Sequence, residues 1–561
     1  MKKKLLTLLF VVTFFAICTN SAAAVENDMV KVGLKYGSSA LFSANLENAV
    51  GEGYEFGYYD EDRDFVSLGE TDEITISMTA AGTIYMNSDG IYSPEEPSGN
   101  YDVMGKWHIQ LEGFEDFDEA LEIAWEYDGY PAYIDGEYVV RIGAFEEEDE
   151  ALEVLEEDEE LCEDWEGDVA RSTDTGVIVT VTKTTEILFE FDCSGIFDLG
   201  VLPMEEDDEE GTATWFKGYK YPGGFSYPRV TGGNLCVINV ADMEDYVKGV
   251  IPYEMNGSWP VEALKAQAVC ARTYAAKTVK HLSAYGFDVC NTTDCQVYYG
   301  RGNNSRYPTS TSDKAVDRTA GECLYYDDEL VQDAVYHASD GGATESSENV
   351  WGSKRGYLKG KEDPYEGEIS IPNYEYSVTY TAKELTYILE QKGYDVGTVK
   401  KAYVSEYTPT GNVCKVTFEG SKGSRTVKGD TCRTIFYSST YNKSVKSLRF
   451  DINGGGKKQT FYVNDEGDTL STLEGVYVLS GSGKTATLEN GSFTVLTRKG
   501  KSSIESVAAS GSSQKADKFT ITGAGSGHNV GMSQYGAKAM AELGYDYDEI
   551  LEFYFTDITI E

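Results

Sequence analysis

The stretch Asp245–Ala284, DYVKGVIPYEMNGSWPVEALKAQAVCARTYAAKTVKHLSA, combines a long helical pattern with a single acidic side chain, Glu254, just before it. Apolar residues recur there at spacings of three and four, as on one buried face of a helix: Val261, Leu264, Ala268, Ala271, Ala275, Val279 and Leu282. Ser258 can cap this helix, and Pro260 is tolerated in its first turn. Because the stripe is mostly Ala, other elements can approach closely, and we expect the helix in the middle of a domain.

Glu254 has apolar or aromatic neighbours in the sequence, Tyr253, Met255 and Trp259. Such surroundings disfavour the charged form of a carboxylic acid, so its pKa rises towards the range useful for proton donation at neutral pH. A Glu beside a helix can instead simply complement the helix dipole, and local physics leaves both roles open. We expect Glu254 on a loop or strand end, because the segment before the helix is interrupted by Gly249, Pro252 and Gly257.

Residues 247–275, VKGVIPYEMNGSWPVEALKAQAVCARTYA, resemble the signature of the stage II sporulation protein D (SpoIID/LytB) family of bacterial cell-wall proteins. The resemblance implies that Glu254 is the acid/base of a lytic transglycosylase. A second segment, HASDGGATE from His337, is similar to the family's HSxSGGxTE, with Ala338 and Asp340 departing from it. A third, GHNVGMSQYGA from Gly527, is similar to GHGVGMSQYGA, with Asn529 in place of a Gly.

His337 and His528 are each flanked by glycines, which let the backbone approach a ligand. Both can be structural residues in turns, but their polar surroundings favour the walls of one cleft. His108 and His281 are assigned no catalytic role. The substrate-binding residues expected from the three segments are Tyr253, Trp259, Arg272, Tyr274, His337, Ser339, Gly341, Gly342, Glu345, His528, Ser533 and Gln534.

Ordinary glycosidases use two carboxylates, whereas only one is well placed around Glu254. A single acid/base suffices if the muramyl C6 hydroxyl is the nucleophile and closes a 1,6-anhydro ring, as the resemblance implies. A second carboxylate would make the enzyme a hydrolase, and the candidates are Asp340, Glu345 and Glu348. The 41 tyrosines offer apolar faces for sugar stacking, although many must belong to the core.

Cys290 and Cys295 are close enough for a disulfide or for two metal ligands. Some spore members of the resembling family have Cys-x-x-x-His-Cys here and bind zinc, but this chain has Asp294 at the position of the His. A zinc site of Cys290, Asp294 and Cys295, a reduced pair and a disulfide remain alternatives. Nine cysteines follow the first 24 residues, so they cannot all pair within the chain.

Residues 1–24 have the pattern of a secretory signal peptide, with three lysines, an apolar run and small residues at the cleavage site. We therefore expect an exported protein associated with the cell wall, and the resemblance implies a Gram-positive spore-former. The formal charge of −48 repels nucleic acid. Acidic runs at 146–166 and 205–210 are expected to be solvated, or to gather divalent cations weakly.

Residues 107–124 and 138–155 form an internal repeat at an offset of 31, with seven of 18 positions identical. Each copy predicts a strand, a turn and an amphipathic helix, and two copies make a split βαβ sandwich. The second copy is similar to the SPOR domain, which implies binding of peptidoglycan glycan strands; a ferredoxin-like packing insert is the alternative.

The predicted fold class is α+β, with mixed strands around a central helix and this small ferredoxin-like, SPOR-like domain inserted near the N-terminus. The expected parts are the signal peptide (1–24), an N-terminal β part (25–104), the SPOR-like domain (105–168) and the catalytic domain (169–561). Strands VKVGLKY, YEFGYYD, DEITISM and TIYMN are expected within residues 29–95, and short strands dominate residues 398–522. Helices are expected near Ser312–Thr319 and Thr381–Lys392, with two more at the C-terminus.

The first functional hypothesis is a peptidoglycan lytic transglycosylase acting on strands stripped of stem peptides, with peptidoglycan as its partner. The second is a non-catalytic wall-binding protein that enhances an N-acetylmuramoyl-L-alanine amidase. A Cys peptidase using Cys270 and His337 is disfavoured, because Cys270 lies inside the helix and not at its start, where a thiolate is stabilised.

Overall fold

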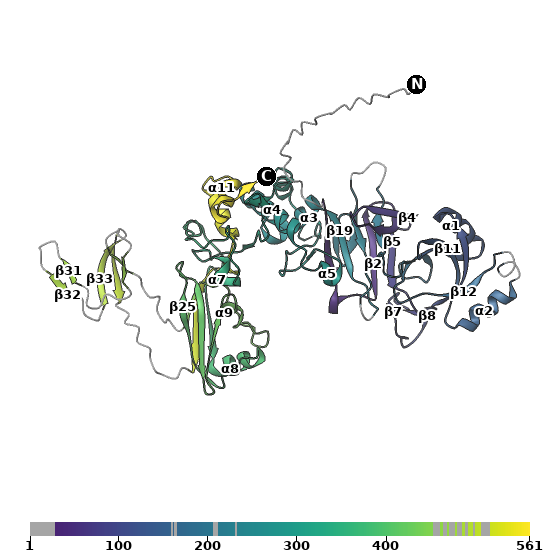
Figure 1. Cartoon of the computed structure of the whole chain (residues 1–561). Helices are drawn as coiled ribbons and strands as arrows, with labels where there is room; N and C mark the ends of the chain where they lie inside the picture. The colour runs from purple at the N-terminus through teal and green to yellow at the C-terminus, as the bar shows by residue number, and fades with distance from the viewer. Residues whose placement is uncertain are drawn as a thin grey trace, which may run out of the picture.

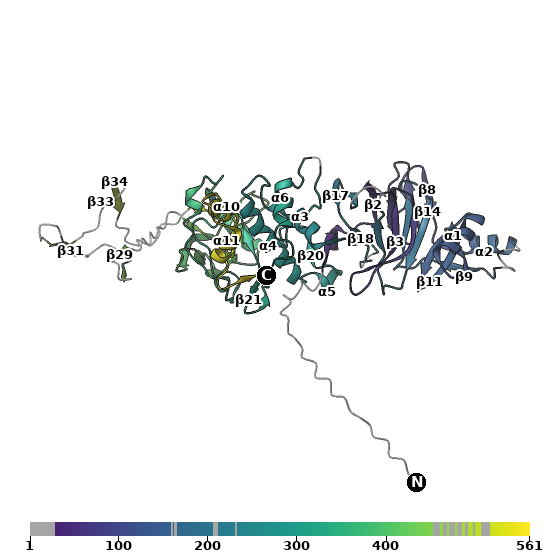
Figure 2. The same cartoon turned by 90° about the horizontal axis from the view of Figure 1, so that it is seen from above.

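The computed structural model describes residues 28–158, 161, 165–205, 211–230, 233–303, 305–452 and 517–561, and the bounds of six short strands between residues 461 and 505. The predicted signal peptide, Cys162 and residues 206–210 of an acidic run lie outside the described residues. Figures 1 and 2 show N-terminal sheets, a helical centre and a strand-rich part in a row. Long runs of strands are separated by a group of helices, and most strand pairs are antiparallel, which confirms the predicted α+β class.

Two large sheets share the N-terminal core. The seven-stranded sheet has the order β20 (Val289–Cys290), β1 (Met29–Lys35), β19 (Val237–Asp242), β18 (Gly224–Ser226), β15 (Gly200–Pro203), β3 (Tyr54–Tyr59) and β4 (Phe65–Thr71). The ten-stranded sheet has the order β12 (Asp168–Arg171), β9 (Trp107–Phe114), β11 (Glu137–Phe145), β10 (Gly129–Ile134), β14 (Ile187–Asp192), β13 (Val177–Val181), β5 (Thr75–Ala80), β2 (Ser43–Val50), β16 (Ala213–Phe216) and β17 (Tyr219–Tyr221). Phe56 of β3 stacks on Phe189 of β14 with ring centroids 5.2 Å apart, so the two sheets face each other across one core.

The internal repeat forms the outer end of the ten-stranded sheet. Its strands are joined by α1 (Phe117–Glu126) and α2 (Glu148–Glu157), and their antiparallel order β12-β9-β11-β10 is that of a ferredoxin-like βαββαβ unit. β10 continues into the body by parallel pairing with β14. A buried ion pair of 2.7 Å joins Arg141 of the repeat to Glu190 of β14. A three-stranded sheet of β6 (Ile84–Asn87), β7 (Tyr92–Ser93) and β8 (Tyr101–Met104) precedes the unit.

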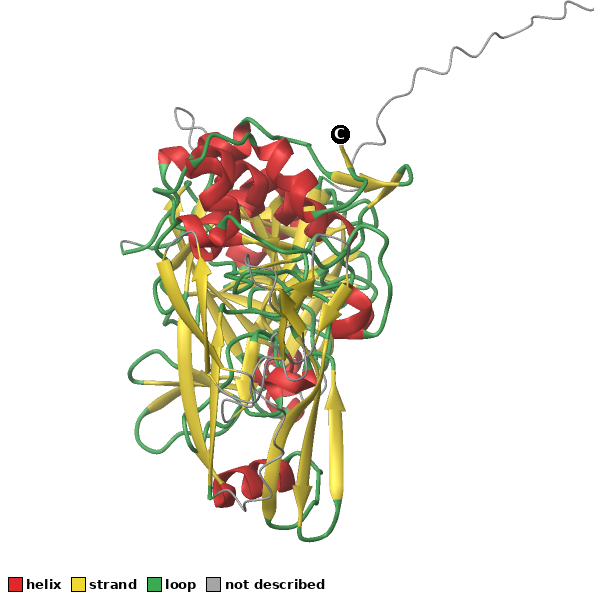
Figure 3. Ribbon diagram, turned by 90° about the vertical axis from the view of Figure 1, so that its left-hand side faces the viewer, coloured by secondary structure: helices red, strands yellow, loops and turns green. Residues whose placement is uncertain are grey.

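Six helices form the centre of the molecule: α3 (Met243–Glu254), α4 (Val261–Lys277), α5 (Leu282–Tyr285), α6 (Ser310–Asp317), α10 (Gln534–Glu542) and α11 (Tyr547–Tyr554). α4 contacts α3, α6, α10 and α11, and its Ala-rich surface is buried, as the small side chains predict. Figure 3 shows helices of this group, in red, together above the strands.

The structure corrects two predictions about this central segment. Glu254 does not lie on a loop or strand end but is the last residue of α3. That helix forms because Asp242 caps it through the backbone N–H groups of Glu244 and Asp245, and because the small Gly249 lets Tyr298 pack against it. Pro252 falls in the last turn and so does not prevent the helix.

The long helix itself is shorter than its apolar pattern predicted. α4 ends at Lys277, and the side chains of Val279 and Leu282 are 59% and 44% exposed. Without a buried face, the β-branched Thr278 and Val279 do not extend the helix. Ser258 does not cap it either, because its hydroxyl donates to the side chain of Asn256 and Pro260 occupies the cap position.

The remaining elements form the strand-rich C-terminal part. Its helices are α7 (Ser347–Trp351), α8 (Ala382–Gln391) and α9 (Thr431–Thr434). Its strands are β21 (Leu324–Tyr326), β22 (Glu329–Leu330), β23 (Tyr336–His337), β24 (Glu375–Thr381), β25 (Val399–Tyr407), β26 (Val413–Gly420), β27 (Ser424–Lys428), β28 (Phe450–Ile452), β29 (Phe461–Val463), β30 (Asp468–Leu470), β31 (Tyr477–Leu479), β32 (Thr485–Thr487), β33 (Ser492–Thr497), β34 (Gly500–Glu505), β35 (Lys518–Ala524), β36 (Met532–Ser533) and β37 (Thr559–Ile560).

Several predictions for this half of the chain are confirmed. Helices α6 and α8 lie where their patterns place them, and the chain closes with the two expected helices α10 and α11. Short strands also dominate residues 398–522 as far as that region is described. None of the helices within the described ranges has the length and apolarity needed to cross a membrane.

Candidate functional site

Glu254 is half-buried at the end of α3, where it accepts a hydrogen bond from the backbone N–H of Val297 at 2.9 Å. The side chains of Gln534 and Tyr336 lie within hydrogen-bonding reach of the same carboxylate. Burial raises the pKa of Glu254, while these hydrogen bonds and the charge of Arg306 act in the opposite direction. Burial is the largest effect, so the acid is tuned towards holding a proton, as the sequence predicted.

A chain of buried polar side chains supports the partners of Glu254. Tyr246 donates to Gln296 at 2.8 Å, and the Gln296 amide donates to the Tyr336 hydroxyl at 3.1 Å. On the other side, Gln534 donates to Gln267, a fully buried residue of α4, at 3.3 Å. The phenol and the amide that face Glu254 are therefore held in place from behind.

The two glycine-rich motifs meet in a parallel strand pair, with Tyr336 opposite Met532 and His337 opposite Ser533. Side chains alternate along a strand, so Tyr336 faces Glu254 and the next residue, His337, points away from it. The pair brings Gln534, which follows β36 directly, to the same carboxylate.

The two histidines pack against each other and not against Glu254. Their ring centroids are 5.3 Å apart, and Trp351 lies 5.2 Å from the ring of His528. Burial lowers the pKa of His337 well below its ordinary value and that of His528 to about 4. Both are therefore neutral near pH 7, and His337 donates its Nδ1–H to the carbonyl of Val530 inside the fold at 3.0 Å.

Several other predicted substrate-binding residues hold the scaffold together. Arg272 is fully buried and forms an ion pair with Glu244 of α3 at 2.5 Å. Glu345 is also buried, and its carboxylate accepts hydrogen bonds from Ser346, Asn349, Thr408, Thr410 and Asn412. Tyr274 lies beside Cys295 and not beside Glu254.

Asp340, Asp363 and Glu366 bring their carboxylate oxygens within 4.8 Å of one another in the interior. Glu366 already accepts four hydrogen bonds, from the hydroxyls of Ser339 and Ser533 and the backbone N–H groups of Asp340 and Gly341. Gly342 donates its backbone N–H to Asp340. Burial, with the charges of Glu366 and Asp363, raises the pKa of Asp340 well above its usual value. Asp340 is therefore favoured in its protonated form beside the other two carboxylates.

A second cluster has the donors of a metal site: His281, Cys290, Asp294 and Cys295 lie with one ligand atom each within 4.8 Å of the others. His281 Nε2 is 3.4 Å from Cys295 Sγ and 3.7 Å from Asp294 Oδ2. Tetrahedral zinc, with bonds of about 2.0–2.3 Å, spaces its ligand atoms about 3.3–3.8 Å apart. The hydrogen bond between the two thiols lowers the pKa of Cys290 to about 4 and raises the pKa of Cys295, so Cys290 is the thiolate of the pair and metal binding would displace the proton of Cys295. The residues present fit zinc, with His281 as a ligand that the sequence did not predict.

Every cysteine within the described ranges is a free thiol. Cys290 and Cys295 are thus not joined by a disulfide. Cys270 is completely buried in α4, and burial raises the pKa of its thiol. A nucleophilic role for Cys270 therefore has no support, in agreement with the expectation from its position inside a helix.

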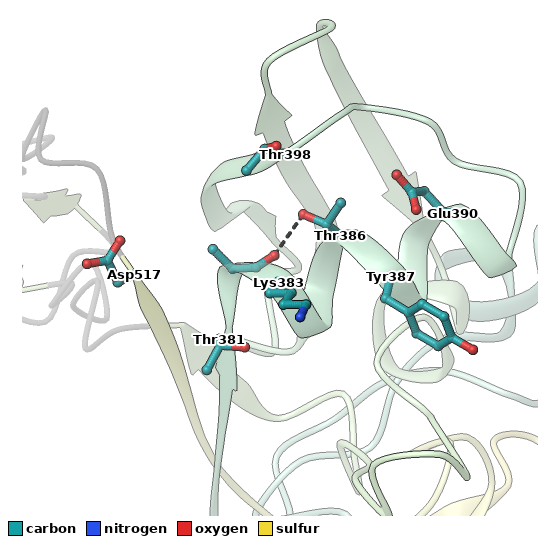
Figure 4. A pocket seen from close by; sticks show the side chains of 8 residues that line it. Thr381, Lys383, Thr386, Tyr387, Glu390, Thr398 and Asp517 are labelled. Carbon is teal, nitrogen blue, oxygen red and sulfur yellow. Dashed lines mark hydrogen bonds between the residues drawn. The ribbon is translucent and has the colours of Figure 1, made fainter.

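A cavity of about 540 Å³ lies on α8, between β24 and the start of β25 (Figure 4). Thr386, Tyr387 and Glu390 of the helix line it, with Thr398 and Asp517 at its edges. Thr386 is tied to the helix backbone by a hydrogen bond to the carbonyl of Ala382, drawn as a dashed line. No predicted site residue lines this cavity.

Sequence reasoning identified Glu254, Tyr253 and Gln534 but missed other members of the site. Tyr336 gave only a partial signal, because strand alternation places it and His337 on opposite faces without saying which face meets Glu254. Gln267 also gave a signal, as a polar residue inside an Ala-rich buried stripe. Val297 and Arg306 lie in a loop-rich segment with no periodic pattern, and only the tertiary structure brings them to Glu254.

Comparisons with known proteins place the central segment in a known family. A family model described as stage II sporulation protein matches residues 231–326, which include Glu254 and the cysteine cluster. An amidase enhancer of Bacillus subtilis (strain 168) is 34% identical over 320 residues, 56% of this chain and 40% of the enhancer. This chain thus spans about two fifths of that relative's length.

Two further relatives align over more of their own length. An uncharacterised protein of Brachyspira hyodysenteriae (strain ATCC 49526 / WA1) is 31% identical over 329 residues, 58% of this chain and 68% of that protein. The stage II sporulation protein D of Bacillus subtilis (strain 168) is 27% identical over 341 residues, 59% of this chain and 77% of that protein.

Proposed function

The chain belongs to the stage II sporulation protein D family, and from that premise we propose that it is a peptidoglycan lytic transglycosylase. Its family supports a cell-wall-related role. The observation that carries the finer proposal is the surroundings of Glu254: a half-buried acid whose contacts are a backbone N–H, an amide, a phenol and a guanidinium charge, none of them acidic. A lone acid/base is what a transglycosylase requires.

In the proposed reaction, protonated Glu254 gives its proton to the glycosidic oxygen of the MurNAc–GlcNAc bond as the bond from the muramyl C1 breaks. The muramyl C6 hydroxyl oxygen attacks C1, and its proton passes to the Glu254 carboxylate. The products are a 1,6-anhydroMurNAc end and a free GlcNAc 4-hydroxyl, and no water is consumed. The Val297 N–H and the side chains of Tyr336 and Gln534 orient the carboxylate in both steps.

The hydrolase alternative finds little support in the candidate second carboxylates. Asp340 belongs to the buried carboxylate cluster, and Glu345 is enclosed by hydrogen-bond donors. Glu348 is exposed on α7 and has no contact with Glu254 among the described hydrogen bonds.

Incubation of peptide-free glycan strands with the purified protein tests the proposal. Mass spectrometry should detect 1,6-anhydromuramyl ends, and Glu254→Gln should reduce their formation by a factor of about 10²–10⁴, because the proton donor is removed. Reducing ends without anhydro rings would instead indicate a hydrolase.

A second candidate function is enhancement of a cell-wall amidase, favoured by the 34% identity to the amidase enhancer. In that case the protein binds glycan without releasing any product. An amidase assay with and without the protein, repeated with Glu254→Gln, separates the two: an enhancer role is unaffected by loss of the acid.

We also propose three properties of the rest of the chain. His281, Cys290, Asp294 and Cys295 would hold a structural zinc, which supplies rigidity and no catalytic step. The ferredoxin-like unit would be a SPOR-like module that binds glycan strands. Export would depend on residues 1–24 and place the protein outside the cytoplasm, at the cell wall.

A further inference from the structure

Three tyrosines from distant parts of the chain form a shelf beside Glu254. Tyr219 of β17 stacks on Tyr299 with centroids 4.6 Å apart and planes inclined by 26°. Tyr253, the neighbour of Glu254 on α3, lies 5.0 Å from Tyr299. All three rings are partly exposed, unlike the fully buried core tyrosines Tyr246 and Tyr298 beside them. Open aromatic faces next to an acid suit the apolar C–H face of a sugar ring.

Arg306 places a fixed positive charge on this shelf. Its guanidinium lies 4.6 Å from the centroid of Tyr253, and its Nε donates to the Pro252 carbonyl at 2.8 Å. The Tyr253 hydroxyl in turn donates to the Arg306 carbonyl at 3.2 Å. The residue is thus anchored by its backbone and Nε, while the terminal nitrogens remain available.

Arg306 forms no ion pair in the part of the chain that the structure describes, although the chain has 95 acidic and 47 basic residues. Its charge acts on Glu254, which is not in direct contact with it. An unpaired, exposed arginine in so acidic a protein attracts an external anion. The planar fork of Arg matches a carboxylate in particular.

A second aromatic pair on the side of Gln534 provides a comparison. Trp259 lies 5.0 Å from Tyr535, and the Lys538 ammonium lies 5.6 Å from the Trp259 centroid. Lys538, however, already pairs with Glu542 at 3.2 Å. Its charge is therefore neutralised within the protein, whereas Arg306 has no ion-pair partner among the residues that the structure describes.

We propose that Arg306 and the shelf of Tyr219, Tyr253 and Tyr299 form a subsite for a sugar that carries a free carboxylate, the lactyl group of peptide-free MurNAc. This inference rests on the proposed function and adds the basis of its specificity. The lactyl group is a carboxylate only when no peptide is attached, since the peptide converts it into a neutral amide. Charge recognition at Arg306 therefore favours MurNAc units whose lactyl group is a free carboxylate over units in which that group is an amide.

Such binding also affects the acid itself. The charge of Arg306 lowers the pKa of Glu254, and a bound carboxylate offsets that charge. A strand with a lactyl carboxylate at Arg306 thus increases the protonation of Glu254, whereas a strand without that carboxylate does not.

Binding measurements in the Glu254→Gln protein test the subsite without turnover. The ligands are peptide-free glycan strands and the same strands with their lactyl carboxylates converted to methylamides. Arg306→Gln should weaken binding of the carboxylate strands about tenfold, the loss expected for a charged hydrogen-bonded contact, and leave the amidated strands unaffected. Arg306→Lys should give an intermediate loss, because it keeps the charge but not the fork.

Lys538→Gln is the matched control and should change binding of either ligand by less than about twofold. Equal losses for both ligands in Arg306→Gln, an unchanged affinity, or no strand binding at all would overturn the subsite. The test of the subsite can fail independently of the proposed activity. If the protein binds both kinds of strand equally well, the subsite is rejected and the transglycosylase proposal is not. If the protein prefers the carboxylate strands but the wild type releases no anhydromuramyl product, the transglycosylase proposal is rejected and the subsite is not.

Discussion

Burial and hydrogen bonding shift the pKa of the Glu254 carboxylate in opposite directions. Burial favours the protonated acid, whereas the Val297 N–H, Gln534 and Tyr336 favour the anion. The raised pKa means that the proton is present below that pKa and is lost as the pH rises through it. Catalysis should therefore decline on the alkaline side, with an apparent pKa above the ordinary value of 4.5.

Tyr336→Phe should move this alkaline limb to higher pH by about one unit, because a hydrogen bond that stabilises the anion is removed. The pH dependence of kcat/KM, followed by release of anhydromuramyl products, measures the shift. Tyr380→Phe is a suitable control, since Tyr380 is also buried and donates to the Phe436 carbonyl at 2.9 Å, away from Glu254. A limb that stays at the wild-type pH in Tyr336→Phe contradicts the assigned contact.

At the level of elements, an ion pair fixes α3 against α4. Arg272 is fully buried and contacts both Glu244 and the Glu322 carbonyl. Arg272→Met should lower the free energy of unfolding by about 3–5 kcal/mol, because Glu244 loses its partner. Denaturant unfolding checks this, and Lys248→Met should cost less than about 1 kcal/mol, since the Lys248–Asp317 pair is exposed at Asp317. If Arg272→Met instead raises KM and leaves the free energy of unfolding unchanged, Arg272 binds the substrate and does not stabilise the two helices.

The proposed zinc site lies around β20, with His281, Cys290, Asp294 and Cys295 as its ligands. The purified protein should contain about one zinc per chain by elemental analysis, and Cys295→Ser should reduce this to near zero. A chelator should lower the melting temperature of the wild type but not of that variant. Cys323→Ser, a buried thiol outside the cluster, should retain the metal. Full metal content in Cys295→Ser would exclude the site.

At the scale of the whole molecule, the repeat unit is part of the body and not a loosely attached insert. β10 pairs with β14, and Arg141 is paired with Glu190 in the interior. Arg141→Met should destabilise this junction by about 3–5 kcal/mol by leaving a buried charge unpaired, and adding Glu190→Leu should restore most of the loss. Limited proteolysis within residues 107–171 measures the effect. Equal sensitivity of wild type and Arg141→Met would show that the pair does not hold the junction.

The elements differ in how well the sequence predicted them, for identifiable reasons. The amphipathic pattern of Thr381–Lys392 predicted α8, and the repeated strand–helix pattern predicted β9 to α2. The Gly and Pro residues near Glu254 suggested a loop, but packing of Tyr246 and Val250 in the core maintains α3 instead. Local propensity is a weak guide wherever burial stabilises a segment.

The sequence by itself determined the α+β class and the central helix, because these depend on periodicity and on residues adjacent in the chain. It also made Glu254 the candidate acid, through its apolar neighbours and the family resemblance. Only the tertiary structure decided that Tyr336 and not His337 faces Glu254. It also decided that His281 lies beside Cys295 and that the Arg306 guanidinium lies over the Tyr253 ring. The physical reason is that these contacts join residues far apart in the chain. Strand pairing, loop closure and burial bring them together, and none of these leaves a local pattern in the sequence.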